Sequence, residues 1–229
     1  YPVGAKGGVF FSYGHFYQLP SIENIFRNSD YSVLANLQAG EERFGVLGNP
    51  DIDPQFTVQY EFGYKHAVSE DLGVVFTVFY KDIRDLVGVE FIDTYTGAED
   101  ARVTNVDFGN VKGVTLAIDR RNLGPLTTTL DYPWEVAEGN SSDPRETATR
   151  AENGQDPRPR LIPFDWDQRH TLNLARTFLD PGRWFASAIV RVVSGQPYTP
   201  AASATGATVS ILESNSGRKP NGVLVDLRG

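Results

Sequence analysis

The amino-acid sequence predicts an all-β fold, and specifically a transmembrane antiparallel β-barrel. Three observations lead to this prediction. Apolar and polar residues alternate with period two, short and long connections alternate along the chain, and aromatic residues gather at the ends of the predicted strands. No stretch approaches the ~18 consecutive apolar residues that a membrane helix needs, so a chain that crosses a membrane would have to do so with strands.

The segment 55–66 shows the alternation most clearly. Because successive side chains of a strand point to opposite faces, period two separates two faces of different chemistry. One face is apolar and aromatic, with Phe56, Val58, Tyr60, Phe62, Tyr64 and His66. The other is wet and partly charged, with Gln55, Thr57, Gln59, Glu61, Gly63 and Lys65. We expect Val58 and Phe62 to face lipid and Gln59 to face the lumen.

About eight strands follow from the same pattern. They are expected near residues 9–17, 55–66, 73–81, 114–119, 126–136, 166–174 and 184–192, with a last strand beginning near 224–228. Pro133 cannot donate a hydrogen bond to a neighbouring strand, so we expect a bulge there or a strand that already ends near Tyr132.

The connections between these strands alternate strictly in length. Three are short turns, at 69–72, 122–125 and 179–183, and four are long polar segments, near 18–54, 88–108, 138–165 and 195–223. An up-and-down sheet would place all the short turns on one rim and all the long loops on the other. This arrangement is typical of outer-membrane barrels, which have brief periplasmic turns and extended extracellular loops.

Aromatic residues lie at both predicted rims. Tyr13, His15, Phe16, Tyr17, Tyr132, Trp134 and Trp166 lie at loop ends of strands, whereas Trp184 follows a short turn. Amphipathic rings at both ends of the strands are typical of the two interfacial girdles of a membrane barrel. A soluble sandwich that buries these rings between two sheets is the alternative.

Composition excludes several classes of function. The net charge of −8 argues against a general nucleic-acid binder, which needs a basic face. Cysteine is absent, so the chain has no thiolate nucleophile and no cysteine-built zinc site. The Gly-x-Ser-x-Gly motif of hydrolases is also missing. We therefore expect no enzyme activity, no catalytic residues and no cofactor.

Metal binding is not expected either. His15, His66 and His170 lie on different predicted strands near strand ends, where an interfacial girdle explains them better than a metal site. Asp51 and Asp53 could offer oxygen ligands to calcium, but the glycine and distal glutamate of a calcium loop are missing.

Two sets of polar residues are candidates for contact with a ligand, without any being assigned as a binding site. The first is the densely charged segment 138–160, a candidate ligand-gathering or lid loop; it also holds a glycosylation sequon at Asn140, to which we give little weight. The second is the expected lumen wall. Its members are Gln59, Glu61, Lys65, Asp119, Asp131, Glu135, Asp167, Arg169 and Arg191.

Six segments, in this order along the chain, resemble TonB-dependent outer-membrane receptors. They are 10–20 (FFSYGHFYQLP), 47–64 (LGNPDIDPQ…YEFGY), 77–87 (TVFYKDIRDLV), 110–116 (NVKGVTL), 166–172 (WDQRHTL) and 194–200 (SGQPYTP). The last two resemble the subset with a carboxypeptidase-regulatory-like N-terminal domain. Gln55 and Thr115 depart from the family, which usually has glutamate at both positions.

The resemblance implies a protein of the cell outer membrane that contacts lipid and captures a ligand with extracellular loops. Such receptors have a 22-stranded barrel filled by a plug, and the TonB energy-transducing complex moves the plug. Residues 1–229 would then be a partial barrel domain without a plug. The ligand stays open among siderophores, vitamins, oligosaccharides and peptides. The alternatives are a complete small barrel with a structural or anchoring role, and a secreted carbohydrate-binding β-sandwich.

Overall fold

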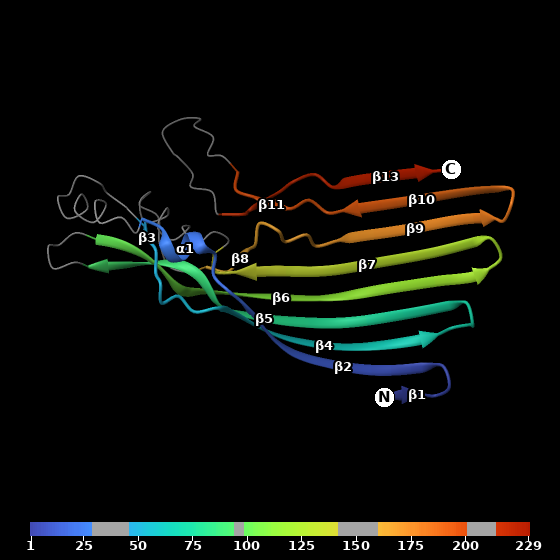
Figure 1. The fold of residues 1–229 in the computed structure, drawn as a ribbon, viewed down its shortest axis with the longest axis horizontal. Coiled ribbons are helices and arrows are strands. Elements are labelled where there is room, and N and C mark those ends of the chain that lie inside the picture. The colour runs from blue at the N-terminus through green and yellow to red at the C-terminus, as the bar shows by residue number, and fades with distance from the viewer. Residues whose placement is uncertain (29–45, 94–98, 142–159, 201–213) are drawn as a thin grey trace.

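The computed structural model describes residues 1–28, 46–93, 99–141, 160–200 and 214–229, most of which lie in antiparallel strands (Figure 1). The elements in chain order are β1 (Pro2–Val3), β2 (Gly7–Gln18), α1 (Ile22–Phe26), β3 (Val46–Leu47), β4 (Gln55–Ala67), β5 (Leu72–Asp93), β6 (Glu99–Leu123), β7 (Leu126–Gly139), β8 (Ile162–Pro163), β9 (Thr171–Asp180), β10 (Trp184–Val193), β11 (Pro197–Tyr198), β12 (Gly217–Arg218) and β13 (Gly222–Arg228).

One large sheet contains all but two of these strands. Its order is β1-β2-β4-β5-β6-β7-β9-β10-β13, with β3 added to β6 and β8 added to β7, while β11 and β12 form a separate pair. Consecutive long strands are neighbours, so the sheet is an up-and-down meander, as expected for a barrel wall. Among the described residues β1 and β13 are its two free edges and do not pair with each other. A closed eight-stranded barrel and a two-sheet sandwich both disagree with this topology.

All the short turns lie at one end of the sheet, on the right of Figure 1, and the long connections lie at the other end. We call these the turn end and the loop end. Gly124 and Gly182 lie in two of the turns with φ of 66° and 81°, a left-handed conformation that glycine adopts without steric cost. The predicted sorting of connections by length is therefore present for the segments near 18–54, 138–165 and 195–223, but not for 88–108, most of which is strand.

The two faces of the sheet differ as the sequence predicts. Tyr60 is in register with Tyr13 of β2 and Tyr80 of β5, and Phe62 is in register with Phe11 and Val78. These rows form the apolar face, which is the exposed one, since Phe62 is 55% accessible. The polar face is the opposite side of the same strands.

Val58 differs from the expectation. It lies on the apolar face but is only 7% accessible. Its cross-strand partners are His15 and Asp82, near the loop end of the sheet. A charge at this position would therefore disturb local packing as well as any contact with lipid, which makes Phe62 the better probe of the apolar face.

The segment 88–108, predicted as a loop, is largely a continuation of β5 and β6. These strands have 22 and 25 residues and extend past the others at the loop end. The register shifts near Asp85, whose φ is 56°. Beyond that irregularity Val87 and Val103 pack with Ile52 in a small apolar core. The alternation was missed there because small apolar residues on the extension are covered by the preceding connection rather than by the sheet itself.

Pro133 neither ends β7 nor makes a bulge against β6. It is in register with Thr115, and β7 continues to Gly139. The reason lies on the other edge of the strand. Glu135 donates its backbone N–H to Arg169, so the position two residues earlier directs its nitrogen toward the same side. On that side the pairing of β7 with β9 breaks after Asp131 and returns only as the bridge between Trp134 and His170, so the missing N–H of Pro133 interrupts the ladder with β9 and leaves the ladder with β6 intact.

Candidate functional site: the loop end of the sheet

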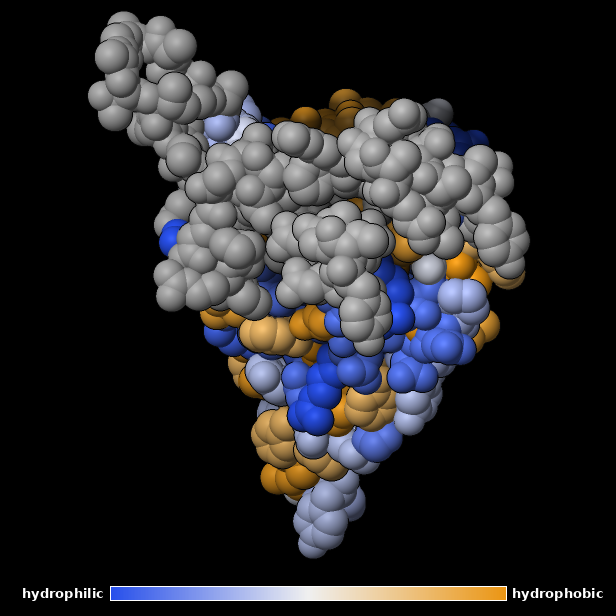
Figure 2. All heavy atoms as spheres, turned by 90° about the vertical axis from the view of Figure 1, so that its left-hand side faces the viewer, coloured by the Kyte–Doolittle hydropathy of each residue, from blue (hydrophilic) through white to orange (hydrophobic). Residues whose placement is uncertain are grey.

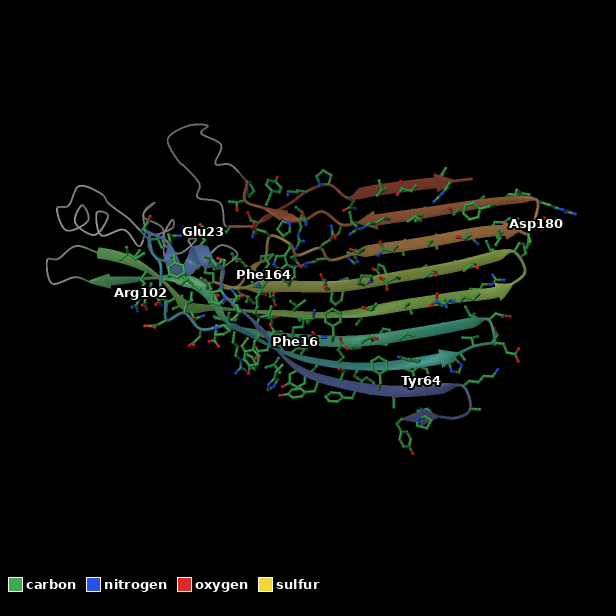
Figure 3. The ribbon with its side chains drawn as sticks, viewed as in Figure 1. Phe16, Glu23, Tyr64, Arg102, Phe164 and Asp180 are labelled. Atoms are coloured by element: carbon green, nitrogen blue, oxygen red, sulfur yellow. The ribbon has the colours of Figure 1, made fainter. Side chains whose placement is uncertain are left out.

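The most densely bonded polar residues lie at the loop end, where connections fold onto the ends of β6 and β7. Figure 2 views this end directly and shows hydrophilic residues across the middle of the described surface, with hydrophobic residues interspersed among them. In Figure 3, Phe164, Phe16 and Arg102 lie toward this end, whereas Tyr64 and Asp180 lie toward the turn end.

Asp167 is the centre of this arrangement. Its side chain is fully buried and accepts the backbone N–H of Ala137 at 2.9 Å. The guanidinium of Arg218 binds both the Asp167 carboxylate and, at 2.8 Å, its backbone carbonyl. Arg169 donates to the same carboxylate at 3.3 Å. These hydrogen bonds satisfy the buried carboxylate and tie β7 to β12.

This carboxylate also explains a difference from the sequence analysis. A strand was expected to begin at Trp166, but β9 begins at Thr171, and before it His170 forms only an isolated bridge with Trp134. Because Asp167 bonds to the end of β7, residues 164–168 do not continue the ladder. Asp167 and Arg169 are therefore loop-end residues and not members of a strand on the lumen wall.

A second contact holds the segment before β12 against the segment after β8. The Asn215 amide donates to the Pro163 carbonyl at 2.8 Å and to the Asp165 carboxylate at 2.7 Å. Asn215 itself has φ of 57°, a conformation that asparagine tolerates better than most residues. Asn215 and Arg218 therefore fix β12 over the loop end through contacts that span about fifty residues of sequence.

Phe164 forms a small apolar core next to these polar contacts. It is 4% accessible, stacks on Trp166 with ring centroids 5.2 Å apart, and packs with Val111 and Ala137. Its ring covers the backbone of Gly109 and Gly139. A Cβ at either glycine would lie 2.4 Å from the ring, so only glycine permits this approach.

Asn140 is part of the same packing. Its amide donates to the Asp107 carboxylate at 2.7 Å, and its side-chain oxygen accepts the N–H of Phe108 at 2.8 Å. The side chain is buried, which is incompatible with an attached glycan. Of the charged segment 138–160, the residues Asp143, Arg145, Glu146, Arg150, Glu152, Asp156 and Arg158 lie outside the described residues.

The segment with Asp51 and Asp53 is anchored by asparagines. The side chain of Asn49 accepts the N–H of Asp51 at 3.0 Å, and that of Asn105 accepts the N–H of Asp53 at 2.8 Å. Both aspartates are exposed. Within the parts of the chain that the structure describes, no group of three or more histidine, aspartate or glutamate residues could hold a metal ion. The two aspartates thus belong to a rigid loop that packs on β6.

The polar face carries the other expected lumen residues. The registers place Gln59, Glu61, Lys65, Asp119, Asp131, Glu135 and Arg191 on this face. Gln59 donates to Glu61 at 2.5 Å, and Glu135 interacts electrostatically with Lys81 and Asp167. Lys81, which the sequence analysis did not single out, lies in register with Gln59. These residues form a polar path from the sheet to the buried Asp167.

Each of the three histidines pairs with a tyrosine on the apolar face. His15 bonds to the hydroxyl of Tyr13, His66 lies 3.1 Å from that of Tyr64, and His170 lies 2.8 Å from that of Tyr132. The first and third pairs lie toward the loop end and the second toward the turn end. The histidines are therefore separated from one another and belong to two bands of aromatic residues.

The apolar band between these two rims has the height expected for a membrane barrel. On the apolar face of β6 the charged residues are Lys112, which forms an ion pair with Glu138 at 2.8 Å, and Arg120. Val114, Leu116 and Ile118 lie between them. Eight residue steps span about 26 Å along a strand. At the tilt of about 35–45° usual for such strands this is about 20 Å along the barrel axis, close to the ~25 Å apolar band of outer-membrane barrels. The described residues include no helix that is long and apolar enough to cross a membrane.

These features define the class of protein: an antiparallel β-barrel wall with an apolar outer band, a polar inner face, short turns at one rim and packed connections at the other. The model of the TonB-dependent receptor-like β-barrel matches residues 7–229, so the chain belongs to this family. Its location is the cell outer membrane.

Solved structures agree in fold. The ferric enterobactin receptor PfeA from Pseudomonas aeruginosa aligns with a TM-score of 0.64 at 15% identity, over 99% of this chain and 30% of that one. The outer membrane transporter YddB from Escherichia coli gives 0.63 at 10% identity, over 97% and 32%. The copper transporter OprC gives 0.56 at 15% identity, over 99% and 29%. No curated protein sequence matches the chain. The chain therefore spans less than a third of the length of these solved relatives.

Proposed function

We propose that the chain contributes wall strands and extracellular connections, but not the plug, to a transporter that takes up a ligand across the outer membrane with energy from TonB. The observation that carries this proposal is the contrast between the two ends of the sheet. Brief turns end the strands on one side, while the other side holds a packed layer of connections centred on Asp167. Such a layer can present a fixed surface to a ligand above a polar lumen.

The polar path below this layer supports passage of a ligand. Glu135, Lys81 and Gln59 lead from Asp167 along the polar face, so a polar solute in the lumen would meet hydrogen-bonding groups of both charges. No enzyme activity is proposed, since the family consists of receptors and transporters. The names of solved relatives include ferric enterobactin, ferric yersiniabactin and copper. We propose metal ions and their chelates as the first ligand class to test.

The experiment compares nutrient uptake in three strains of the host: wild type, a deletion of the gene that encodes the chain, and a deletion of TonB. Labelled iron supplied as ferric enterobactin or ferric yersiniabactin, and copper ions, are the first probes. Uptake of at least one probe is expected to fall to the same low level in both deletions. Uptake that requires the gene but is unchanged without TonB would contradict the proposal.

A further inference from the structure

Two arginines lie on the apolar face near the turn end, with a threonine between them. Arg120 of β6 is in register with Thr128 of β7, and Thr128 is in register with Arg176 of β9. Adjacent strands are about 4.8 Å apart, so the Cα atoms of the two arginines are about 10 Å apart. Two long side chains at this spacing can converge on one group that lies over the threonine.

None of these three side chains has a partner among the described residues. No carboxylate there forms an ion pair with Arg120 or Arg176, and the Thr128 hydroxyl is buried without a hydrogen-bond partner. The polar residues next to them in the sequence, by contrast, do have partners. Asp119 accepts a hydrogen bond from Thr129 at 3.0 Å and forms an ion pair with Arg121 at 3.3 Å. Asp119 and Arg121 therefore neutralise each other, whereas Arg120 and Arg176 have no counter-charge among the described residues.

A shallow apolar groove adjoins Arg176. Its volume is about 630 Å³. The apolar side chains that line it are Leu126, Phe178, Ala186, Ala188 and Leu227. The groove exists because two alanines follow one another on the apolar face of β10, with Ala188 in register with Arg176 and Ala186 in register with Phe178. Phe178 stacks on Trp184 at 4.4 Å and closes the groove toward the turn end.

The position of this site along the strands restricts what can occupy it. Arg120 lies at the turn-end border of the apolar band, and short turns of such barrels are periplasmic. The site therefore faces the inner leaflet at the depth of its headgroups. The cost of an arginine on the lipid face falls steeply from the bilayer centre to this interface, where phosphate groups can bind a guanidinium with two hydrogen bonds.

We propose that Arg120 and Arg176, which lie on either side of Thr128, bind the phosphate of an anionic phospholipid, and that one acyl chain of this lipid lies in the groove over Ala186 and Ala188. Two arginines without a counter-charge favour a lipid with net negative charge over a zwitterionic one. The ammonium group of phosphatidylethanolamine already neutralises its phosphate. The groove supplies space for the chain, and the two guanidinium groups fix the headgroup.

The test uses the protein expressed from its complete reading frame and purified in a mild detergent. Phosphatidylglycerol and phosphatidylethanolamine are titrated separately, and bound lipid is counted by native mass spectrometry. Each of Arg120→Gln and Arg176→Gln should weaken binding of phosphatidylglycerol about fivefold, and the double variant about 25-fold. Binding of phosphatidylethanolamine should be weak throughout.

Two further variants separate this site from general charge effects. Arg121→Gln removes a neighbouring arginine that is paired with Asp119, and it should leave lipid binding unchanged. Ala188→Phe keeps all charges but fills the groove, and it should weaken binding. Equal affinity for the two lipids, unchanged binding in the double variant, an equal loss in Arg121→Gln, or displacement of the lipid by inorganic phosphate would each overturn the proposal.

Discussion

Two regions of this protein, the strands of the apolar band and the loop end, are stabilised by different interactions. In the apolar band, each strand needs only alternate apolar and polar residues. Any apolar side chain can face lipid, and the neighbouring strands satisfy the hydrogen bonds of the backbone. At the loop end, single residues such as Asp167 and Phe164 make specific contacts with residues that are distant in the sequence. In the apolar band, substitutions that keep a residue apolar or polar should therefore be tolerated. At the loop end, most substitutions of such residues should destabilise the protein.

The largest effect is expected at Asp167. Asp167→Ala leaves Arg218 without its buried partner and the N–H of Ala137 without an acceptor, which should cost about 3 kcal/mol in the free energy of unfolding. Denaturant titration of the refolded protein in detergent measures this. Asp131→Ala, on the polar face of β7, is the control and should cost less than about 0.5 kcal/mol. Equal costs at the two sites would show that the loop end has no special centre.

The next effect should distinguish the two faces of β4. Phe62→Arg places a charge on the exposed apolar side and should destabilise the protein by about 2–4 kcal/mol, whereas Gln59→Arg on the polar face should be mild. Folding yield into vesicles and the unfolding free energy are the readouts. Similar tolerance at both positions would mean that the faces are misassigned.

A smaller effect is expected where Phe164 covers glycine. Gly109→Ala introduces a Cβ 2.4 Å from the ring, so the ring must shift, at a cost of about 1–3 kcal/mol. The fluorescence of Trp166, which stacks on Phe164, should change with it. Gly73→Ala is the matched control, because its Cβ would meet nothing within 4 Å. An unchanged Trp166 signal in Gly109→Ala would contradict this packing.

The smallest effect concerns the tyrosine–histidine pairs. Tyr132→Phe removes the hydroxyl that lies 2.8 Å from His170 and should cost about 0.5–1.5 kcal/mol. Tyr80→Phe serves as the comparison, since Tyr80 is an exposed apolar-face residue for which the structure shows no such bond. If both variants cost the same, the pairing with histidine adds nothing to the interfacial position of the ring.

The sequence predicts the strands of the apolar band well because the patterns that mark them are local. Period two and glycine in tight turns are visible in short stretches of sequence, and the lengths of the connections follow from the strands that border them. The loop end could not be predicted in this way. Asp167 meets Arg218 across fifty-one residues, and Asn215 meets Pro163 across fifty-two, with no local pattern to mark either pair.

Two errors have the same origin. The segment 88–108 is expected to be a loop from its sequence, but the structure shows it mostly as strand. Its apolar residues are covered by residues 46–52, which lie far away in the sequence and leave no local pattern. The strand expected from Trp166 is shortened because the Asp167 carboxylate bonds to β7. In both cases a contact distant in sequence overrides a local pattern, which is also why the lumen residues could be placed on a face but not assigned a ligand.

The most direct test of the central claim, that one face of this sheet meets lipid and the other the lumen, is spin-label scanning along β4. The chain has no cysteine, so single cysteines at positions 57–65 can be labelled one at a time. In membranes, collision with oxygen should peak at Tyr60, Phe62 and Tyr64 and fall at Gln59 and Glu61. Accessibility to oxygen that does not alternate along the strand, or that peaks at Gln59 and Glu61, would contradict the account.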